Sequence, residues 1–201
     1  IGAGLGGGSA NAAATLILLR KLFNKEKKSK KMSISNLYKI ANKLGSDVPA
    51  CLESKSLRLS GYGNKITRNK FSKNYYYLLV NPNIKLSTKK VFSNFKYFSN
   101  EKSIDDKVFF ENIFIYNSLL SSAISLAPQI SFILSILKNI PGVVAYGMSG
   151  SGSTCFGIFN DINNILPISK YFEDEYFFWY GKKKDYNVNR VHCSKKLENK
   201  F

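Results

Sequence analysis

The first eight residues of the chain hold five glycines, at positions 2, 4, 6, 7 and 8, and a stretch rich in alanine and leucine follows. Glycine has no Cβ and tolerates positive φ, so consecutive backbone N–H groups of such a run can converge on one anion. The helix expected from about Ser9 to Phe23 adds first-turn N–H groups that lack partners inside the helix, and the positive end of its dipole. The pattern therefore indicates a loop that binds the phosphates of a nucleotide.

Other classes of glycine-rich segment share part of this pattern. A flexible linker is one, but a linker is not followed at once by a helical pattern with a suitable N-cap such as Ser9. The spacing Gly2-x-Gly4-x-x-Gly7 fits the dinucleotide fingerprint, which also needs an acidic residue at the end of a second strand about twenty residues later. Glu26, the acidic residue of region 20–31, lies in a lysine run instead. A Walker A loop would end in Gly-Lys-Ser or Gly-Lys-Thr, and a protein-kinase loop would precede a strand. The segment has neither feature, so neither class fits.

Asp47 is the second candidate for chemistry. A helix is expected from about Ser33, with one apolar face formed by Ile34, Leu37, Ile40, Ala41 and Leu44. Gly45 is suited to end that helix, and Pro49 fits the first turn of a further one, which places Asp47 at or next to its start. An aspartate at such a position is typical of a cap or turn. It can also accept the proton of an attacking hydroxyl group.

The glycine run resembles a motif of small-molecule kinases. Gly4-Leu-Gly-Gly-Gly-Ser9, followed by Ala10 and Asn11, is similar to the phosphate-binding motif of the GHMP kinases, the superfamily of galactokinase, homoserine kinase, mevalonate kinase and phosphomevalonate kinase. The resemblance implies ATP as phosphate donor, with Mg²⁺ bridging its phosphates and no protein residue assigned as metal ligand. It implies that ATP is bound by Ile1, Gly2, Ala3, Gly4, Leu5, Gly6, Gly7, Gly8, Ser9 and Ala10. It also implies that Asp47 is the catalytic base, because Gly45-Ser-Asp-Val-Pro49 matches the family segment that carries the catalytic aspartate.

A second glycine-rich segment, Met148-Ser-Gly-Ser-Gly-Ser-Thr-Cys-Phe156, lies between two predicted strands. By itself it is typical of a hairpin with a glycine turn. It also resembles the third motif of the same kinases, whose loop packs beside the phosphate loop and the substrate and helps to hold the reacting groups in line. The resemblance implies that Gly150, Ser151 and Gly152 contribute to substrate binding.

Two further segments resemble the family in part. After Asn81-Pro82, Thr88 and Phe92 match a turn-to-helix pattern that helps to form a cytidine pocket in one branch of these kinases, which implies that they bind substrate. Asn83 replaces the usual glycine there, and an aromatic residue at a helix start is also typical of a core position. Further on, the family's Asn-Asp-Leu reads Asn117-Ser-Leu, and the loss of the acidic residue argues against a catalytic role for that segment.

Two domains are expected to position these segments in an α+β fold. Residues 1–70 would form the C-terminal part of the ATP-binding N-terminal domain of a GHMP kinase and end in two short strands around Gly61 and Gly63. Residues 71–201 would form the C-terminal domain, in which 94–112 is expected to be a loop and 111–120 to enter a helix. Its order of strand, helices, strand, strand, helix and strand favours a ferredoxin-like layer of helices on an antiparallel sheet. Since the chain begins inside a motif, we expect a preceding segment that carries the lysine which assists the aspartate in this family.

The formal net charge of +17 raises the alternative of a basic nucleic-acid-binding protein, because lysine and arginine that neutralise phosphates drive such binding. The lysines are scattered, however, along a chain that is also rich in Asn, Ile, Tyr, Phe and Ser, a bias typical of a gene with low GC content. We therefore expect a small-molecule alcohol as substrate and neither nucleic acid nor membrane as partner. Homoserine and mevalonate, the alcohols phosphorylated by other members of the superfamily, remain alternatives to a cytidine-containing alcohol as acceptors of the phosphoryl group.

The cysteines indicate the compartment. Cys51, Cys155 and Cys193 are odd in number and lack Cys-x-x-Cys spacing, which argues for a reducing environment and against a disulfide framework or a zinc site. No apolar run reaches the length that spans a membrane. We expect a cytoplasmic protein that is a monomer or a homodimer.

Overall fold

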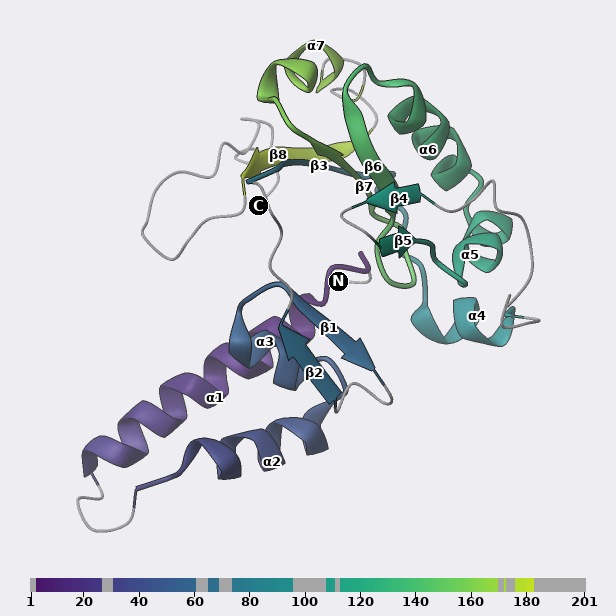
Figure 1. Ribbon diagram of the computed structural model, residues 1–201. Helices are drawn as coiled ribbons and strands as arrows, with labels where there is room; N and C mark the ends of the chain where they lie inside the picture. The colour runs from purple at the N-terminus through teal and green to yellow at the C-terminus, as the bar shows by residue number, and fades with distance from the viewer. Residues whose placement is uncertain are drawn as a thin grey trace, which may run out of the picture. The chain divides into compact units, whose positions relative to one another are not determined.

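The computed structural model describes residues 3–26, 31–60, 65–68, 74–95, 108–110, 113–169, 172 and 176–182 of the chain (Figure 1). The chain divides into two compact units. One comprises Ile1 with Gly6–Phe71, and the other comprises Gly2–Leu5 with Ser72–Phe201. The sequence pattern does not indicate that the segment up to Leu5 associates with the second unit.

The described part of the first unit is mainly helical (Figure 1). It contains α1 (Gly7–Glu26), α2 (Ile34–Leu44), α3 (Val48–Glu53) and an antiparallel pair of strands, β1 (Leu57–Ser60) and β2 (Lys65–Arg68). The two predicted strands are thus present, whereas the glycine turn expected between them lies outside the described residues.

The ends of α2 agree with the sequence pattern, and the start of α1 does not. The side chain of Ser33 caps α2 by accepting a hydrogen bond from the backbone N–H of Asn36, and Gly45 follows as the C-cap. Helix α1 was expected to begin at Ser9, but it begins at Gly7. The reason is that Gly6 adopts a φ of 64°, open to glycine, directly before the helix, so Ser9 lies inside the first turn.

The predicted apolar face of α2 is only partly buried. Leu37 and Ala41 are buried, whereas Ile34, Ile40 and Leu44 are exposed. Helices α1 and α3 pack against the side of α2 that carries Ala41, and Ala13, Ala41 and Val48 form the buried cluster of this unit. The core of the first unit is therefore small in the part of the chain that is described.

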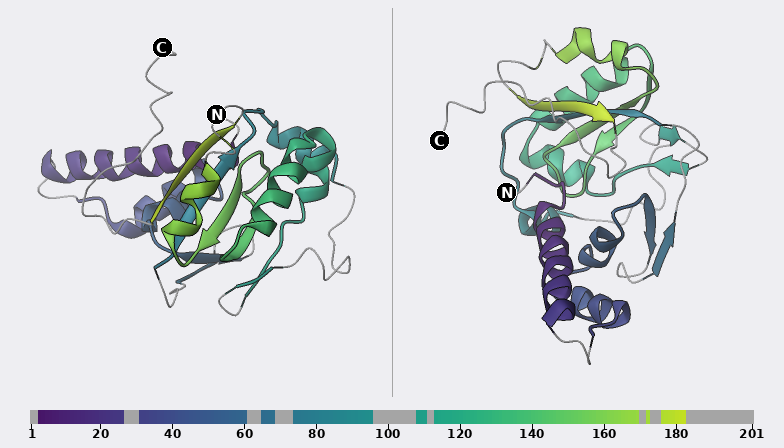
Figure 2. Two further views of the ribbon diagram at one scale, coloured as in Figure 1. Left: turned by 90° about the horizontal axis from the view of Figure 1, so that it is seen from above. Right: turned by 90° about the vertical axis from the view of Figure 1, so that its left-hand side faces the viewer.

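The second unit is built on a four-stranded antiparallel sheet with the order β6-β7-β3-β8 (Figures 1 and 2). The strands are β3 (Tyr76–Asn81), β6 (Val143–Met148), β7 (Cys155–Phe159) and β8 (Phe177–Lys182). In chain order these are the first to fourth strands, so their spatial order is 2-3-1-4. With α5 (Leu120–Leu126) and α6 (Gln129–Asn139) before β6 and α7 (Leu166–Ser169) before β8, this is a ferredoxin-like βαββαβ arrangement, which confirms the predicted α+β fold.

Helices and a short hairpin complete this unit. The helices are α4 (Thr88–Ser93), α5 (Leu120–Leu126), α6 (Gln129–Asn139) and α7 (Leu166–Ser169), with a 3₁₀ turn η2 (Ile162–Asn164). The hairpin consists of β4 (Val108–Phe110) and β5 (Ile113–Ile115), and it lies beside β6. The sequence pattern predicted a loop over 94–112, of which 96–107 and 111–112 lie outside the described residues, and entry into a helix over 111–120. The helix α5 does begin at Leu120. For 108–110 and 113–115 the prediction was wrong, because these two short segments pair with each other as strands.

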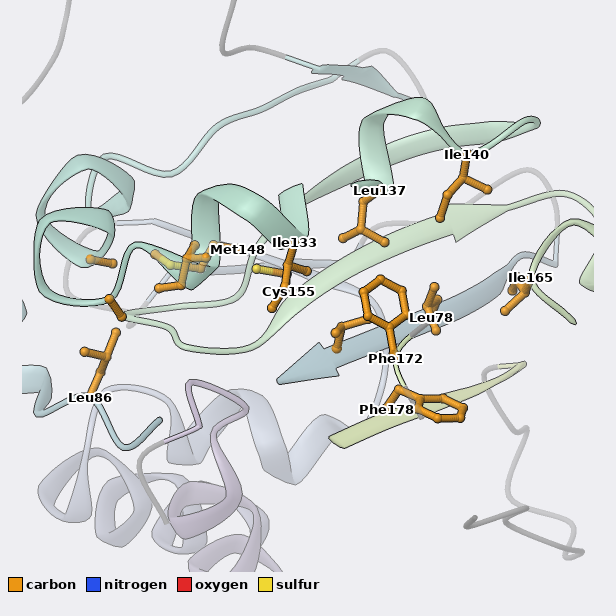
Figure 3. Close-up of a cluster of buried hydrophobic side chains, with 14 of the residues drawn as sticks. Leu78, Leu86, Ile133, Leu137, Ile140, Met148, Cys155, Ile165, Phe172 and Phe178 are labelled. Carbon is orange, nitrogen blue, oxygen red and sulfur yellow. The ribbon is translucent and has the colours of Figure 1, made fainter. Parts of the chain in front are cut away.

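The core of the second unit lies between α6 and the sheet (Figure 3). Ile130, Ile133 and Leu137 recur on one face of α6 and are fully buried. They meet Leu78 of the central strand β3 and Phe159 of β7 in the same cluster. Because burying a side chain of this size contributes about 1.5–3 kcal/mol, this layer fixes the sheet that carries the loop between β6 and β7.

Candidate active site

The first turn of α1 presents unpaired backbone donors. The first hydrogen bond of the helix runs from the N–H of Ala10 to the carbonyl oxygen of Gly6, at 2.9 Å. The N–H groups of Gly7, Gly8 and Ser9 precede that bond, so they have no acceptor inside the helix. A Cβ built on Gly6, Gly7 or Gly8 would meet no atom within 4 Å. An anion can therefore approach this turn without displacing protein atoms, at the positive end of the helix dipole.

Asp47 stands at the N-cap position of α3, as the sequence predicts, but its side chain does not cap the helix. The residue is exposed. The hydroxyl of its neighbour Ser46 donates a hydrogen bond to Oδ1 at 3.4 Å. The carboxylate therefore accepts no capping hydrogen bond from the backbone of its own helix.

Packing within the first unit brings Asp47 to the same end as the first turn of α1. Ala13 lies one turn after Ser9 on the same side of the helix, and it is 1% exposed against Val48, the residue after Asp47. Cys51 lies one turn further along α3. Burial raises the pKa of its thiol, and the negative charge of nearby Asp47 raises that pKa further. The structure thus joins two of the residue groups that the sequence singles out.

Residues 3–5, the first that the structure describes, are held in the second unit by the loop between β6 and β7. The Oγ of Ser149 donates a hydrogen bond to the carbonyl oxygen of Gly4 at 2.7 Å, and the N–H of Thr154 donates to that of Ala3 at 3.3 Å. Gly4 has a φ of 71°, and a Cβ added to it would collide with the carbonyl oxygen of Ser149 and lie 2.7 Å from that of Gly152. Only glycine fits there. Ile1 and Gly2, the other two residues of the predicted set, lie outside the described residues.

Asn81, which the sequence reading did not select, anchors the far side of this loop. It ends β3, and its Nδ2 donates to the Oγ1 of Thr154 at 2.8 Å and to the Oγ of Ser153 at 3.2 Å. The Ser153 hydroxyl donates in turn to the carbonyl oxygen of Ile84 at 2.6 Å. Ser153 and Thr154 are almost fully buried, so these bonds also satisfy polar groups that would otherwise be costly to bury. The sequence signal that could have found Asn81 is its place at the end of a strand before a proline.

The predicted substrate-binding residues of α4 lie at the surface of the second unit. Thr88 opens the helix, and its hydroxyl lies 3.1 Å from that of Ser151 in the glycine loop. Phe92 is 57% exposed, and the core position of this helix is Val91, which is fully buried. The alternative of Phe92 as a core residue is therefore wrong. Gly150 and Gly152, with φ of 55° and 82°, form the bends of the same loop.

The described residues also bear on the metal, membrane and cysteine expectations. No group of three or more His, Cys, Asp and Glu side chains suited to a metal ion is found there. None of the described helices is both long and apolar enough to cross a membrane. Cys51 and Cys155 carry free thiols, and Cys193 lies outside the described residues.

Comparison with known families agrees with this architecture. A model of the GHMP kinases N terminal domain matches residues 1–55, and a model of the GHMP kinases C terminal region matches residues 103–167. The two matches together cover more than half of the chain. The chain therefore belongs to the GHMP kinases.

Within that superfamily, the chain is similar to enzymes named 4-diphosphocytidyl-2-C-methyl-D-erythritol kinase. It is 39% identical to that of Ehrlichia canis over 180 residues, which are 85% of this chain and 61% of the relative. It is 40% identical to that of Ehrlichia chaffeensis over 173 residues, which are 82% of this chain and 59% of the relative. The chain thus spans about three fifths of the length of these relatives.

Two solved structures share the fold. A crystal structure of 4-(cytidine 5'-diphospho)-2C-methyl-D-erythritol kinase superposes with a TM-score of 0.71 at 24% identity and covers 90% of this chain and 66% of the other. A homoserine kinase from Cytophaga hutchinsonii superposes with a TM-score of 0.57 at 12% identity, over 92% of this chain and 66% of the other. At these identities the likeness concerns the fold alone.

Proposed function

We propose that the full-length protein transfers the γ-phosphoryl group of ATP to the 2-hydroxyl of 4-diphosphocytidyl-2-C-methyl-D-erythritol. This is a step of the non-mevalonate, or methylerythritol phosphate, route to isoprenoid precursors. The observation that carries the proposal is an open turn of backbone donors, Gly7–Ser9, in the same compact unit as the uncapped carboxylate of Asp47. The choice of acceptor is supported by the relatives of that name.

The residues present fit a nucleotide triphosphate. The phosphates would lie on the N–H groups of the first turn of α1, where a negative charge gains about 0.3–1 kcal/mol from the helix dipole. Gly4 would hold the start of the loop in place through its bond to Ser149. A Mg²⁺ ion, bound mainly through the phosphate oxygens, would neutralise charge that develops on the transferred group.

Asp47 would act as the general base. Its carboxylate accepts the proton of the acceptor hydroxyl as that oxygen forms a bond to the γ-phosphorus. The bond between the γ-phosphorus and the oxygen bridging it to the β-phosphate breaks, and ADP leaves. Positioning of the two reactants supplies much of the acceleration in such a transfer, and a base adds about 10²- to 10⁴-fold.

The second unit would bind the acceptor. The exposed ring of Phe92 can stack on the cytosine base, and the paired hydroxyls of Thr88 and Ser151 can hydrogen-bond its polar groups. Gly150 and Gly152 would contribute by shaping the loop that carries Ser151: their positive φ values form its bends, and a Cβ on Gly150 would lie 3.1 Å from the carbonyl oxygen of Gly4. A cytoplasmic location is part of the proposal, because the free thiols of Cys51 and Cys155 suit a reducing compartment.

A coupled assay that measures ADP release tests the proposal on the full-length protein. We expect turnover with 4-diphosphocytidyl-2-C-methyl-D-erythritol and at most one hundredth of that kcat/KM with homoserine or mevalonate. Preferred turnover of homoserine or mevalonate would show that the acceptor is a different alcohol, and the proposed kinase activity would stand. No ATP turnover with any of these alcohols would end the proposal.

A further inference from the structure

Asn117 uses all of its side-chain hydrogen-bonding groups on backbone partners. It lies between β5 and α5 and is half-buried. Its Nδ2 donates to the carbonyl oxygens of Met148 at 2.9 Å and Gly150 at 2.8 Å, and its Oδ1 accepts from the N–H of Leu119 at 3.0 Å. A primary amide has two N–H donors and one carbonyl oxygen, so no other side chain of this size matches this set of partners.

The two carbonyl groups that Asn117 holds lie on either side of Ser149. That residue donates its hydroxyl to Gly4, and its backbone carbonyl accepts from the N–H of Gly152 at 2.9 Å. Asn117 is therefore linked to Gly4 by its bonds to Met148 and Gly150, by the covalent backbone between those two residues, and by the hydroxyl of Ser149; Gly4 precedes the first turn of α1 in the chain. Every bond up to Gly4 lies within the second unit.

We propose that Asn117 is a positioning residue of the phosphoryl transfer: its amide fixes the loop Ser149–Ser153 so that Ser149 holds Gly4. The proposal rests on the function proposed above. Asn117 itself touches no reacting atom. The sequence pattern pointed away from this segment because Ser118 replaces an acidic residue, yet the neighbouring amide makes the contacts with the loop.

The test is Asn117→Asp in the full-length protein, with Asn139→Asp as the matched control. N117D keeps the acceptor for Leu119 and turns two donors into an oxygen that faces two carbonyl oxygens. Asn139 lies in α6 of the same unit and donates its Nδ2 to the carbonyl oxygen of Ser135 at 2.8 Å, away from the loop. We expect kcat/KM for ATP to fall by about tenfold to hundredfold in N117D, as misplacement of a reacting group does, and to stay within about twofold in N139D.

Amide hydrogen exchange separates positioning from general destabilisation. We expect the N–H groups of Ser149, Gly152 and Thr154 to exchange about tenfold faster in N117D, with the amides of β3 and β8 unchanged. A second variant, Asn117→Ala, removes the donors without adding a charge and should show the same local pattern. This readout also holds if the catalytic assay fails, since it measures the loop and not the reaction.

The outcomes decide between the alternatives. Unchanged exchange in the loop, or wild-type kcat/KM in both Asn117 variants, would overturn the positioning role. Faster exchange spread evenly over the whole sheet would also overturn it and leave Asn117 as a general stabiliser. Absence of turnover in the wild-type protein would refute the proposed function, while the exchange comparison would still decide whether Asn117 holds the loop.

Discussion

Phe92 is an aromatic residue whose ring is mostly in solvent, although it lies in a helix whose neighbouring residue Val91 is fully buried. Leaving such a ring exposed forgoes the free energy that its burial would contribute. Stacking on a base offers a reason for this exposure, because it stabilises a complex by about 1–3 kcal/mol per base. The role of the ring in binding the acceptor is therefore a proposal that substitution can test.

A Phe92→Ala variant tests this assignment at the scale of one residue. We expect KM for the cytidyl substrate to rise about 5- to 100-fold, the range that corresponds to loss of one stacking contact, with KM for ATP unchanged. Phe132→Ala is the control, because Phe132 is equally exposed, at 57%, but lies on α6. Steady-state kinetics with each substrate varied in turn measure both constants. An equal rise of both constants, or no change in F92A, would remove Phe92 from the site.

The residues that the sequence identified differ in kind from those that it missed. Gly4, Asp47 and Thr88 are marked by short motifs, in which neighbours in sequence carry the information. Asn81 and Asn117 gain their roles from partners about 30 to 70 positions away, Thr154 and Gly150, and no local spacing encodes such partners. A single sequence therefore points to candidate substrate-binding groups more readily than to the amides that hold their loops.

Helix α6 carries much of the packing that keeps the second unit in shape (Figure 3). Leu137 is fully buried in the central cluster, so Leu137→Ala should lower the free energy of unfolding by about 2–5 kcal/mol. Leu126→Ala is the control, because Leu126 ends α5 with 41% of its surface exposed and should cost much less. Chemical denaturation of both variants measures the difference. Equal losses would mean that α6 does not form the core as described.

Elements with local end signals were predicted well. Ser33 and Gly45 mark the ends of α2, and glycine bends mark the loop between β6 and β7. The hairpin of β4 and β5 was missed because its strands have three residues each and are stabilised mainly by their pairing. For α2 the sequence pattern predicted too much burial. Periodicity identifies an apolar face of a helix, but it does not show whether another element covers that face.

At the scale of the whole molecule, the net charge of +17 attracts anions of every kind. An enzyme for anionic small molecules and a nucleic-acid-binding protein would share this property. They differ in how they bind anions. The enzyme binds one nucleotide in a defined site, whereas the nucleic-acid-binding protein contacts many phosphates of a polyanion and releases the counterions bound to them.

Binding of fluorescently labelled random oligonucleotides, followed by anisotropy, distinguishes these two classes. We expect no saturable binding at micromolar protein and physiological salt, because the lysines are scattered along the chain, and we expect any binding at low salt to vanish steeply as salt is added. Saturable binding at physiological salt that ATP does not displace would favour the nucleic-acid-binding alternative.

Family membership and fold are consistent over both units, whereas the activity is a proposal, since the chain spans about three fifths of its relatives' length. The central claim is that the Asp47 carboxylate accepts the proton of the acceptor hydroxyl. The most direct measurement is kcat of Asp47→Asn in the full-length protein, beside binding of a non-hydrolysable ATP analogue to the same variant. We predict a fall in kcat of about 10²- to 10⁴-fold with binding of the analogue retained, because the amide turn is untouched. Wild-type kcat in D47N would contradict the account.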